Sequence, residues 1–191
     1  PSLIERFSWL PTEASGGLAD GNIYVGDPRL TPETAWIAEV GFDWQSSTAY
    51  ARPAIYYRRV DNFIQGVPFD GTPGLINTSV EMVSAANGDA TPLRFANVDA
   101  EIWGADIACG TRLAGPLRLD GFASYVRSRR RDIPDNLYRI APPNGRLALA
   151  WDANDWMLAF EVQGFAAQNR VSTTNSEATT RGYVLANLTG H

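Results

Sequence analysis

Carboxylates and arginines recur along this chain at positions where they could support acid–base catalysis or form ion pairs. The carboxylates fall on the polar side of predicted extended segments: Glu39, Asp43, Asp106, Asp120 and Glu161. Three arginines share that side: Arg112, Arg118 and Arg146. A catalytic pair of carboxylates must converge on one substrate. We favour instead a polar wall in which carboxylates and arginines pair across neighbouring strands.

The residues needed for nucleophilic or metal chemistry are scarce. The chain has one cysteine, Cys109, and one histidine, His191. A single histidine argues against a histidine-based triad or a multi-histidine metal site, and a single cysteine argues against a disulfide framework. Cys109 lies in an apolar run and is interpreted as a small apolar side chain. We therefore expect no catalytic residues, no metal site and no cofactor.

A cluster of arginines is the most concentrated charge in the sequence. Residues 127–132 contain four arginines and one aspartate, and we expect them to open a long external loop. One hypothesis is that Arg129 and Arg130 bind an anionic metal chelate through forked hydrogen bonds. The alternative, which we favour, is contact with anionic lipopolysaccharide or simple solvation.

A second candidate region is the stretch 65–92, which has the composition of a long surface loop. It contains several glycines but no phosphate-binding glycine motif. External loops often carry ligand contacts, and Phe69, Asp70 and Asn77 are the candidates here.

Length and charge limit the classes of protein to consider. The chain has 191 residues, enough for one ordinary domain, and a net charge of −5. All 16 cationic residues are arginine, and the overall negative charge argues against nucleic acid as a partner. No segment approaches the roughly 18 apolar residues of a membrane helix. The first residues lack the pattern of a signal peptide, so we expect a cytosolic protein or an internal piece of a longer one.

Alternating hydrophobicity predicts about seven β-strands. They begin near residues 36, 50, 103, 117, 146, 156 and 183. In residues 36–44 one face carries Trp36, Val40 and Trp44, and the other carries Glu39 and Asp43.

The lengths of the connections alternate strictly between short and long. Residues 45–48, 114–116 and 152–155 form short turns, whereas 62–94, 128–143 and 167–181 form long polar stretches. Tryptophans flank the short turns, and Trp36, Tyr125 and Tyr183 lie at the opposite strand ends. Alternating connections and two aromatic belts are typical of an antiparallel up-and-down barrel in an outer membrane. A soluble β-sandwich or lipocalin-like barrel, with its apolar face turned inward, is the alternative.

Several segments together resemble TonB-dependent outer-membrane receptors. Residues 1–6 and 26–33 are similar to that family's "P-S-x-x-E" and "G-N-P-x-L-x-P-E" segments. Residues 56–64, 97–106 and 140–143 are similar to later strand motifs, in the family order. Residues 97–100 and 166–171 most resemble the copper and metal-chelate receptors within it.

The resemblance implies an all-β transmembrane barrel of about 22 strands, of which this chain would supply seven or eight. In that family a plug domain lies inside the barrel, and TonB drives uptake of a scarce ligand such as a metal chelate or siderophore. The implied partners are the TonB complex, outer-membrane lipid, lipopolysaccharide and the chelate. The implied location is the outer membrane of a Gram-negative bacterium.

The sequence departs from the family pattern at both ends. We find no plug, TonB box or terminal aromatic strand in this sequence. We therefore expect residues 1–191 to be a partial barrel domain. The contact with TonB would be made by an N-terminal region that is missing here. Seven strands alone would leave two open sheet edges, which a bilayer does not tolerate. A passive porin or a soluble ligand-binding barrel is the alternative function.

Overall fold

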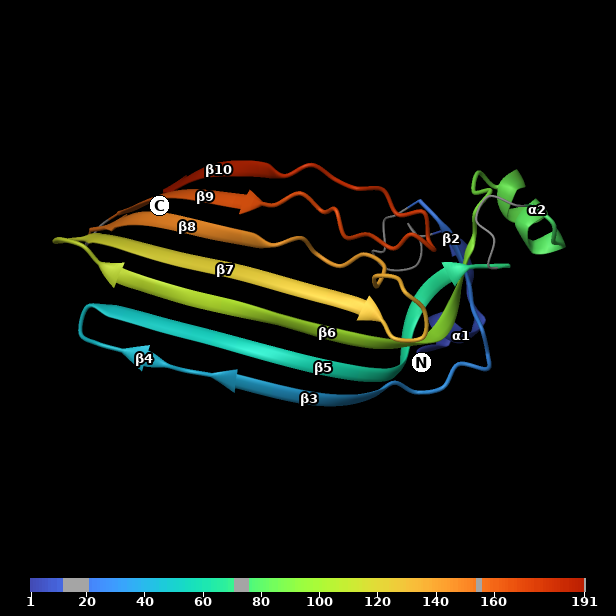
Figure 1. Ribbon diagram of the computed structural model, residues 1–191. Coiled ribbons are helices and arrows are strands. Elements are labelled where there is room, and N and C mark those ends of the chain that lie inside the picture. The colour runs from blue at the N-terminus through green and yellow to red at the C-terminus, as the bar shows by residue number, and fades with distance from the viewer. Residues whose placement is uncertain (12–20, 71–75, 154–155, 191) are drawn as a thin grey trace.

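The computed structural model describes residues 1–11, 21–70, 76–153 and 156–190, most of which belong to one curved, mainly antiparallel sheet (Figure 1). The short strands are β1 (Trp9–Pro11), β2 (Ile23–Val25) and β4 (Trp44–Gln45). The long strands are β3 (Thr34–Gly41), β5 (Ala49–Pro68), β6 (Leu93–Arg112), β7 (Leu117–Arg130), β8 (Asn144–Asp152), β9 (Met157–Phe165) and β10 (Tyr183–Gly190). The helices are α1 (Leu3–Phe7) and α2 (Ser79–Ala86). His191 and part of the predicted turn 152–155 lie outside the described residues.

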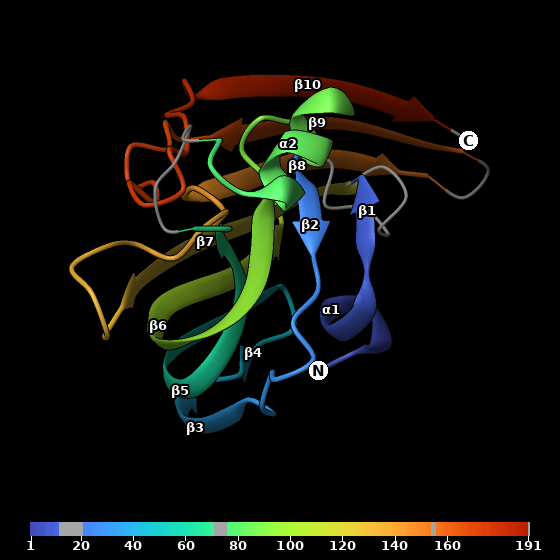
Figure 2. The same ribbon diagram turned by 90° about the vertical axis from the view of Figure 1, so that its right-hand side faces the viewer.

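The seven long strands pair in chain order, so the predicted all-β, up-and-down architecture is confirmed. β3 and β4 pair with β5, and antiparallel pairs then run in order from β5 to β10. The one parallel pair in the described sheet joins β2 to the start of β6. Seen end-on, the sheet is an open arc with β3 and β10 at opposite edges (Figure 2). No helix among the described residues is long and apolar enough to span a membrane.

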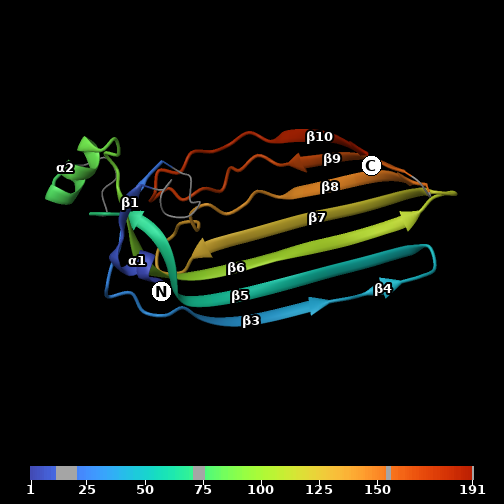
Figure 3. The same cartoon turned by 180° about the vertical axis from the view of Figure 1, so that it is seen from behind.

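The turns gather at one end of the sheet and the long connections at the other, as the sequence predicts. Figure 3 shows the short β6–β7 turn, the end of β8 and the start of β9 at the end away from α1 and α2. The connections 131–143 and 166–182, and the described residues of 69–92, lie at the helix end, which we call the long-loop end.

Strand register collects the apolar side chains on one face of the sheet. Residues directly opposite in an antiparallel ladder point to the same face. One such row joins Ala51, Cys109, Gly121, Leu147 and Val162 across five strands. The predicted position of Cys109 on the apolar face is therefore confirmed.

The apolar face is well exposed. Leu147 and Leu149 have 59% and 39% of their surface exposed, whereas Ala150, which points to the opposite face, has 4% exposed. Aromatic pairs lie toward the two ends of this face. Trp151 stacks on Trp156 at the turn end, with ring centroids 6.3 Å apart, and Trp36 meets Tyr57 edge-on at 6.1 Å toward the long-loop end.

The opposite face is a polar wall, and three of its predicted carboxylates form ion pairs. Arg118 Nε lies 2.7 Å from Asp120, Arg146 lies 3.2 Å from Glu161, and Arg52 lies 3.1 Å from Asp43. Arg118 and Asp120 both belong to β7, so this pair lies along one strand and not across neighbouring strands as predicted. Within the described residues, Glu39, Asp106 and Arg112 form no ion pair, so the predicted network is only partly present.

Tyrosines on this polar face of β5 lie over glycines of β6. A Cβ on Gly104 would lie 2.5 Å from the Tyr56 hydroxyl, and one on Gly110 would lie 2.5 Å from the Tyr50 ring. The Tyr50 hydroxyl donates a hydrogen bond of 3.0 Å to Asp120 Oδ1, which joins β5 to β7 across that glycine. Glycine within a strand is expected where another group approaches so closely.

We expect Gly110→Val to destabilise the sheet by about 1–3 kcal/mol, because the new side chain displaces Tyr50 and breaks its bond to Asp120. The measurement is the urea midpoint of unfolding of the receptor that contains this chain. Gly164→Ala is the matched control, since a Cβ there meets nothing within 4 Å. Equal midpoints for the two variants would contradict this packing.

Three boundaries differ from the sequence prediction. β5 and β6 continue through much of the stretch 62–94 that we expected to be loop, with a bulge after Val60 where Asn62 has φ 61°. α2 occupies part of the predicted loop 65–92; a capping box formed by Thr78 and Glu81 begins it. β7 runs to Arg130, so Arg129 and Arg130 end a strand rather than open a loop.

Candidate functional site

The extended ends of β5 and β6 build a protein core at the long-loop end. Val60, Val67, Val98 and Ala100 are buried there against Leu137, which belongs to the connection 131–143. A second cluster joins Tyr24 and Leu30 to Leu93 and Phe95 of β6. These strands therefore have protein against both faces beyond the bulge, which explains why apolar alternation fades there.

Asp135 joins two of the long connections. Its carboxylate accepts hydrogen bonds from the backbone N–H groups of Thr173 and Thr174 at 2.8 and 3.0 Å. It also accepts bonds from the hydroxyls of Ser172 and Thr173 at 2.8 and 3.0 Å. Burial raises the pKa of Asp135, but the hydrogen bonds from the backbone of Thr173 and Thr174 and from the Ser172 hydroxyl outweigh it and hold the pKa well below its usual range. The ionised carboxylate thus fixes residues 172–174 to the connection 131–143.

Further hydrogen bonds complete this framework. Asn136 donates from Nδ2 to the backbone carbonyl of Val171 at 3.0 Å. Glu177 accepts from the backbone N–H groups of Arg139 at 3.0 Å and Ser172 at 2.7 Å. Asn175 donates to the carbonyl of Gly66 in β5 at 2.7 Å. The connections 131–143 and 166–182 therefore form one assembly with the long-loop end of β5.

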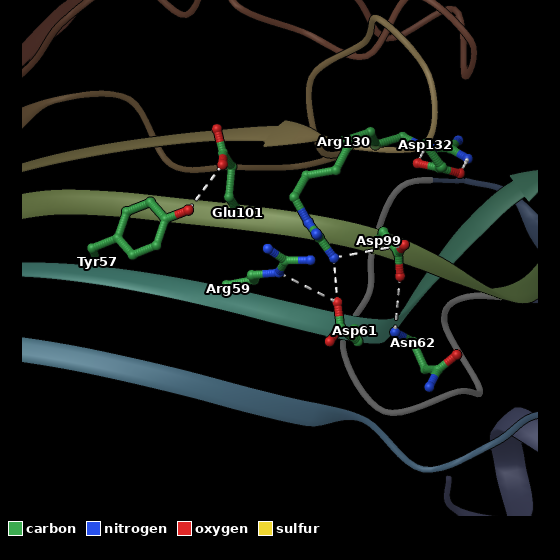
Figure 4. Close-up of polar contacts among 9 residues, drawn as sticks. Tyr57, Arg59, Asp61, Asn62, Asp99, Glu101, Arg130 and Asp132 are labelled. Carbon is green, nitrogen blue, oxygen red and sulfur yellow. Dashed lines mark hydrogen bonds and ion pairs between the residues drawn. The ribbon is translucent and has the colours of Figure 1, made fainter.

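Arginines and carboxylates alternate across the strands beside this assembly. Arg59, Glu101 and Arg129 occupy one transverse row, on the same face as Tyr57 and Trp103. Glu101 accepts hydrogen bonds from Arg129 Nε and from the Tyr57 hydroxyl, and Arg129 lies over the Trp103 ring at 6.0 Å. Figure 4 shows Tyr57, Arg59 and Glu101 together on β5 and β6.

Asp61 on β5 and Asp99 on β6 continue the network (Figure 4), beside Arg131, which directly follows β7. Arg131 pairs with Asp61 and lies 3.6 Å from Asp99. Arg59 lies 3.7 Å from Asp61, and Asp99 accepts a bond of 3.4 Å from the backbone N–H of Asn62 at the bulge.

Arg130 points away from this row and pairs with Asp132. The distance from Arg130 Nη2 to Asp132 Oδ2 is 2.5 Å, and the Arg130 side chain is 8% exposed. The bond from Arg130 lowers the pKa of Asp132, so this aspartate carries a charge at neutral pH.

The predicted arginines line one cavity. It has a volume of about 680 Å³ and is bounded by Glu101, by Arg129 to Asn136 and by Thr173. This size lies within the range of pockets that hold small ligands. Arg129 and Arg130 therefore line the same cavity, and Arg131 is a third arginine in its lining.

The other predicted contacts lie elsewhere. Phe69 and Asp70 border a smaller cavity of about 180 Å³ beside Glu81 and Asn175. The backbone N–H of Asn77 donates to Glu81 at 3.1 Å and so supports the start of α2. Four of the five predicted residues thus divide between two cavities, Asn77 lines neither of them, and no described residue borders both.

Sequence reasoning missed Asp61, Asp99, Glu101 and Asp135. Asp61 has Arg59 and Phe63 two positions away, and Glu101 has Trp103 two positions away, which is a usable signal, but the partners of these carboxylates depend on strand register. Asp135 makes contacts 37 to 39 residues away, for which the sequence gives no local pattern. Among the described residues, no group of three or more metal-binding side chains is close enough to hold an ion.

The comparisons with known proteins agree with this architecture. Residues 1–191 match the family model described as "TonB dependent receptor-like, beta-barrel". No curated protein matches the chain.

Solved structures share the fold at low sequence identity. The copper transporter OprC has a TM-score of 0.71 at 20% identity, over 87% of this chain and 24% of its own. The ferric enterobactin receptor PfeA of Pseudomonas aeruginosa has a TM-score of 0.62 at 20% identity, over 88% and 25%. The siderophore receptor PirA of Acinetobacter baumannii has a TM-score of 0.58 at 18% identity, over 87% and 26%. The chain therefore spans about a quarter of the length of each of these proteins.

Proposed function

The chain belongs to the TonB-dependent receptor β-barrel family, and we propose that its strands form part of the wall of a receptor in the outer membrane of a Gram-negative bacterium. The receptor would take up a scarce ligand, such as a metal chelate or siderophore, with energy delivered by the TonB complex. It would bind and move its ligand rather than catalyse a reaction.

The exposed apolar face carries this proposal. Trp36, Val40, Ile55, Leu147 and Leu188 are each more than half exposed on that face. An apolar surface of this extent is unfavourable in water, whereas an outer-membrane barrel presents such a band to lipid and keeps its polar side inward. Aromatic pairs toward both ends of the band support the same placement.

The arginine-lined cavity supports an anionic ligand. Arg129, Arg130 and Arg131 border one space, and each pairs with a carboxylate of the protein. Carboxylate, catecholate or phosphate oxygens of a ligand would bind these guanidinium groups through paired hydrogen bonds by replacing those partners. Ligand contact by Arg129 and Arg130 is therefore part of the proposal. Phe69, Asp70 and Asn77 are proposed as contacts of the separate region around α2.

Uptake assays in whole cells test the proposal. Cells that express the gene product containing this chain are given radiolabelled copper or radiolabelled ferric enterobactin, with and without an intact tonB gene. We expect TonB-dependent accumulation of at least one of these probes. The double variant Arg129→Ala/Arg130→Ala should weaken binding of that probe by roughly tenfold or more, whereas Arg118→Ala on the polar wall should not.

Two results would overturn the proposal. Accumulation that does not change when tonB is deleted would favour a passive porin. Recovery of the chain in the soluble fraction, as a monomer without detergent, would favour a soluble ligand-binding barrel. Unchanged affinity in the double arginine variant would remove those two residues from the ligand site.

A further inference from the structure

The apolar face contains a hollow at the long-loop end of the band. Its volume is about 510 Å³, and it extends over β5 to β9. Small residues on the apolar face create the space: Ala105, Ala123, Gly145 and Gly164. Ile55, Ile107 and Tyr125 form its sides. An apolar hollow on a face that meets lipid has the shape and chemistry to hold an acyl chain.

A polar cavity directly adjoins this hollow. It has a volume of about 250 Å³, and Tyr125 and Pro143 border both spaces. Arg127 and Arg170 line the polar cavity together with Ser128, Gln168 and Asn169, and no described residue of its lining is acidic. Both arginines can therefore face a bound anion without a competing carboxylate in the same cavity.

Arg127 is held in position for such a role. Its Nε donates a hydrogen bond of 2.6 Å to the Tyr125 hydroxyl, and its guanidinium lies 5.7 Å from the centre of the Tyr125 ring. Tyr125 thus touches the apolar hollow and orients the adjacent cation. Arg170 comes from the connection 166–182, where its backbone N–H donates to the Gln168 side chain at 3.1 Å.

We propose that the two cavities together bind one lipid of the outer leaflet, the lipid A part of lipopolysaccharide. An acyl chain occupies the hollow beside Gly164, and a sugar phosphate binds Arg127 and Arg170. The apolar hollow lies on one side of Tyr125, and the cavity lined by Arg127 and Arg170 lies on the other. This arrangement matches an amphiphile that has an acyl chain and a phosphate group. The proposal rests on the outer-membrane placement proposed above but not on the identity of the transported ligand.

Native mass spectrometry of the purified receptor in detergent micelles tests this site. The probes are phosphorylated lipid A, its dephosphorylated form, and phosphatidylglycerol. We expect selective retention of phosphorylated lipid A and a loss of affinity of roughly tenfold or more in Arg127→Gln/Arg170→Gln, since hydrogen bonds to charged groups are strong.

A second variant tests whether the apolar hollow binds an acyl chain, and it changes no charged residue. Gly164→Leu should fill the hollow, and it should fold normally because a Cβ at Gly164 meets nothing within 4 Å. It should weaken binding of lipid A but not of the deacylated phosphorylated disaccharide. Arg118→Gln is the control for loss of an arginine, since Arg118 pairs with Asp120 outside both cavities.

Three results would overturn the site: equal binding of dephosphorylated lipid A, equal binding of phosphatidylglycerol through the same arginines, or an equal loss in Arg118→Gln. Uptake and cell fractionation on the same variants separate the two proposals. Normal TonB-dependent uptake without selective lipid A binding would refute the lipid site alone, whereas absence of the chain from the outer membrane would refute both.

Discussion

Leu147→Arg is expected to lower the free energy of unfolding of the receptor in a bilayer by about 2–4 kcal/mol, because it places a guanidinium in the apolar band. Leu147 is 59% exposed on the face that we assign to lipid, in the same row as Gly121 and Val162. The measurement is a urea titration of the receptor in phospholipid vesicles.

The adjacent residue supplies the matched control. Ala148 points to the opposite face, where its partner in the ladder is Glu161. Arginine at Ala148 can pair with that carboxylate, so we expect a cost below about 1 kcal/mol. A larger cost at Ala148 than at Leu147 would mean that the two faces are assigned the wrong way round.

The second large effect is expected at Asp135. Asp135→Ala removes the acceptor of four hydrogen bonds from residues 172–174 and leaves their donors without that partner. Hydrogen bonds to charged groups are strong, so we expect local opening of the connection 166–182 to become easier by roughly 2–4 kcal/mol. Limited proteolysis of this connection should accelerate on the order of 100-fold.

Asp132→Ala is the control, because Asp132 lies in the same connection but pairs with Arg130 instead. Equal proteolysis of the two variants would contradict the role of Asp135.

The pH dependence of proteolysis gives a further check on the role of Asp135. Since the pKa of Asp135 is lower in the folded protein than its usual value of about 3.9, its stabilising effect is present at higher pH and is lost as pH falls through the folded pKa. Proteolysis of the unmodified receptor should therefore stay constant from about pH 8 to 5 and increase only under stronger acid.

The sequence was most informative within the apolar band. There each strand has lipid on one side and a polar wall on the other, so period-two alternation identifies both the strand and its faces. Residues 117–125 and 156–164 followed this pattern closely, and the register placed their apolar residues on one face as predicted.

The strand ends were harder to predict for a physical reason. Beyond the bulge at Asn62, β5 and β6 pack against Leu137 on one side and Tyr24 on the other, so both faces are partly apolar and the alternation fails. The helix α2 was missed although its capping box, Thr78 and Glu81, is visible in the sequence.

The candidate site was predictable only in part. The cluster of arginines at residues 127–131 correctly indicated one cavity, because a high local density of charge can be seen in the sequence itself. The pairing of Glu101 with Arg129 and of Asp61 with Arg131 depends on which residues face each other across strands. That register follows from turn geometry and packing, which the local pattern does not specify.

The central claim is that one face of this sheet meets lipid and the other meets water, and spin labelling along β9 tests it most directly. Single cysteines are placed at residues 158–163 of the receptor, with Cys109→Ser as the background, and each is labelled and exposed to oxygen and to a water-soluble nickel chelate. The account predicts highest oxygen contact at Leu158, Phe160 and Val162, and highest nickel contact at Ala159, Glu161 and Gln163. Shielding of the first three positions from both reagents, as in a soluble barrel with an apolar interior, would contradict it.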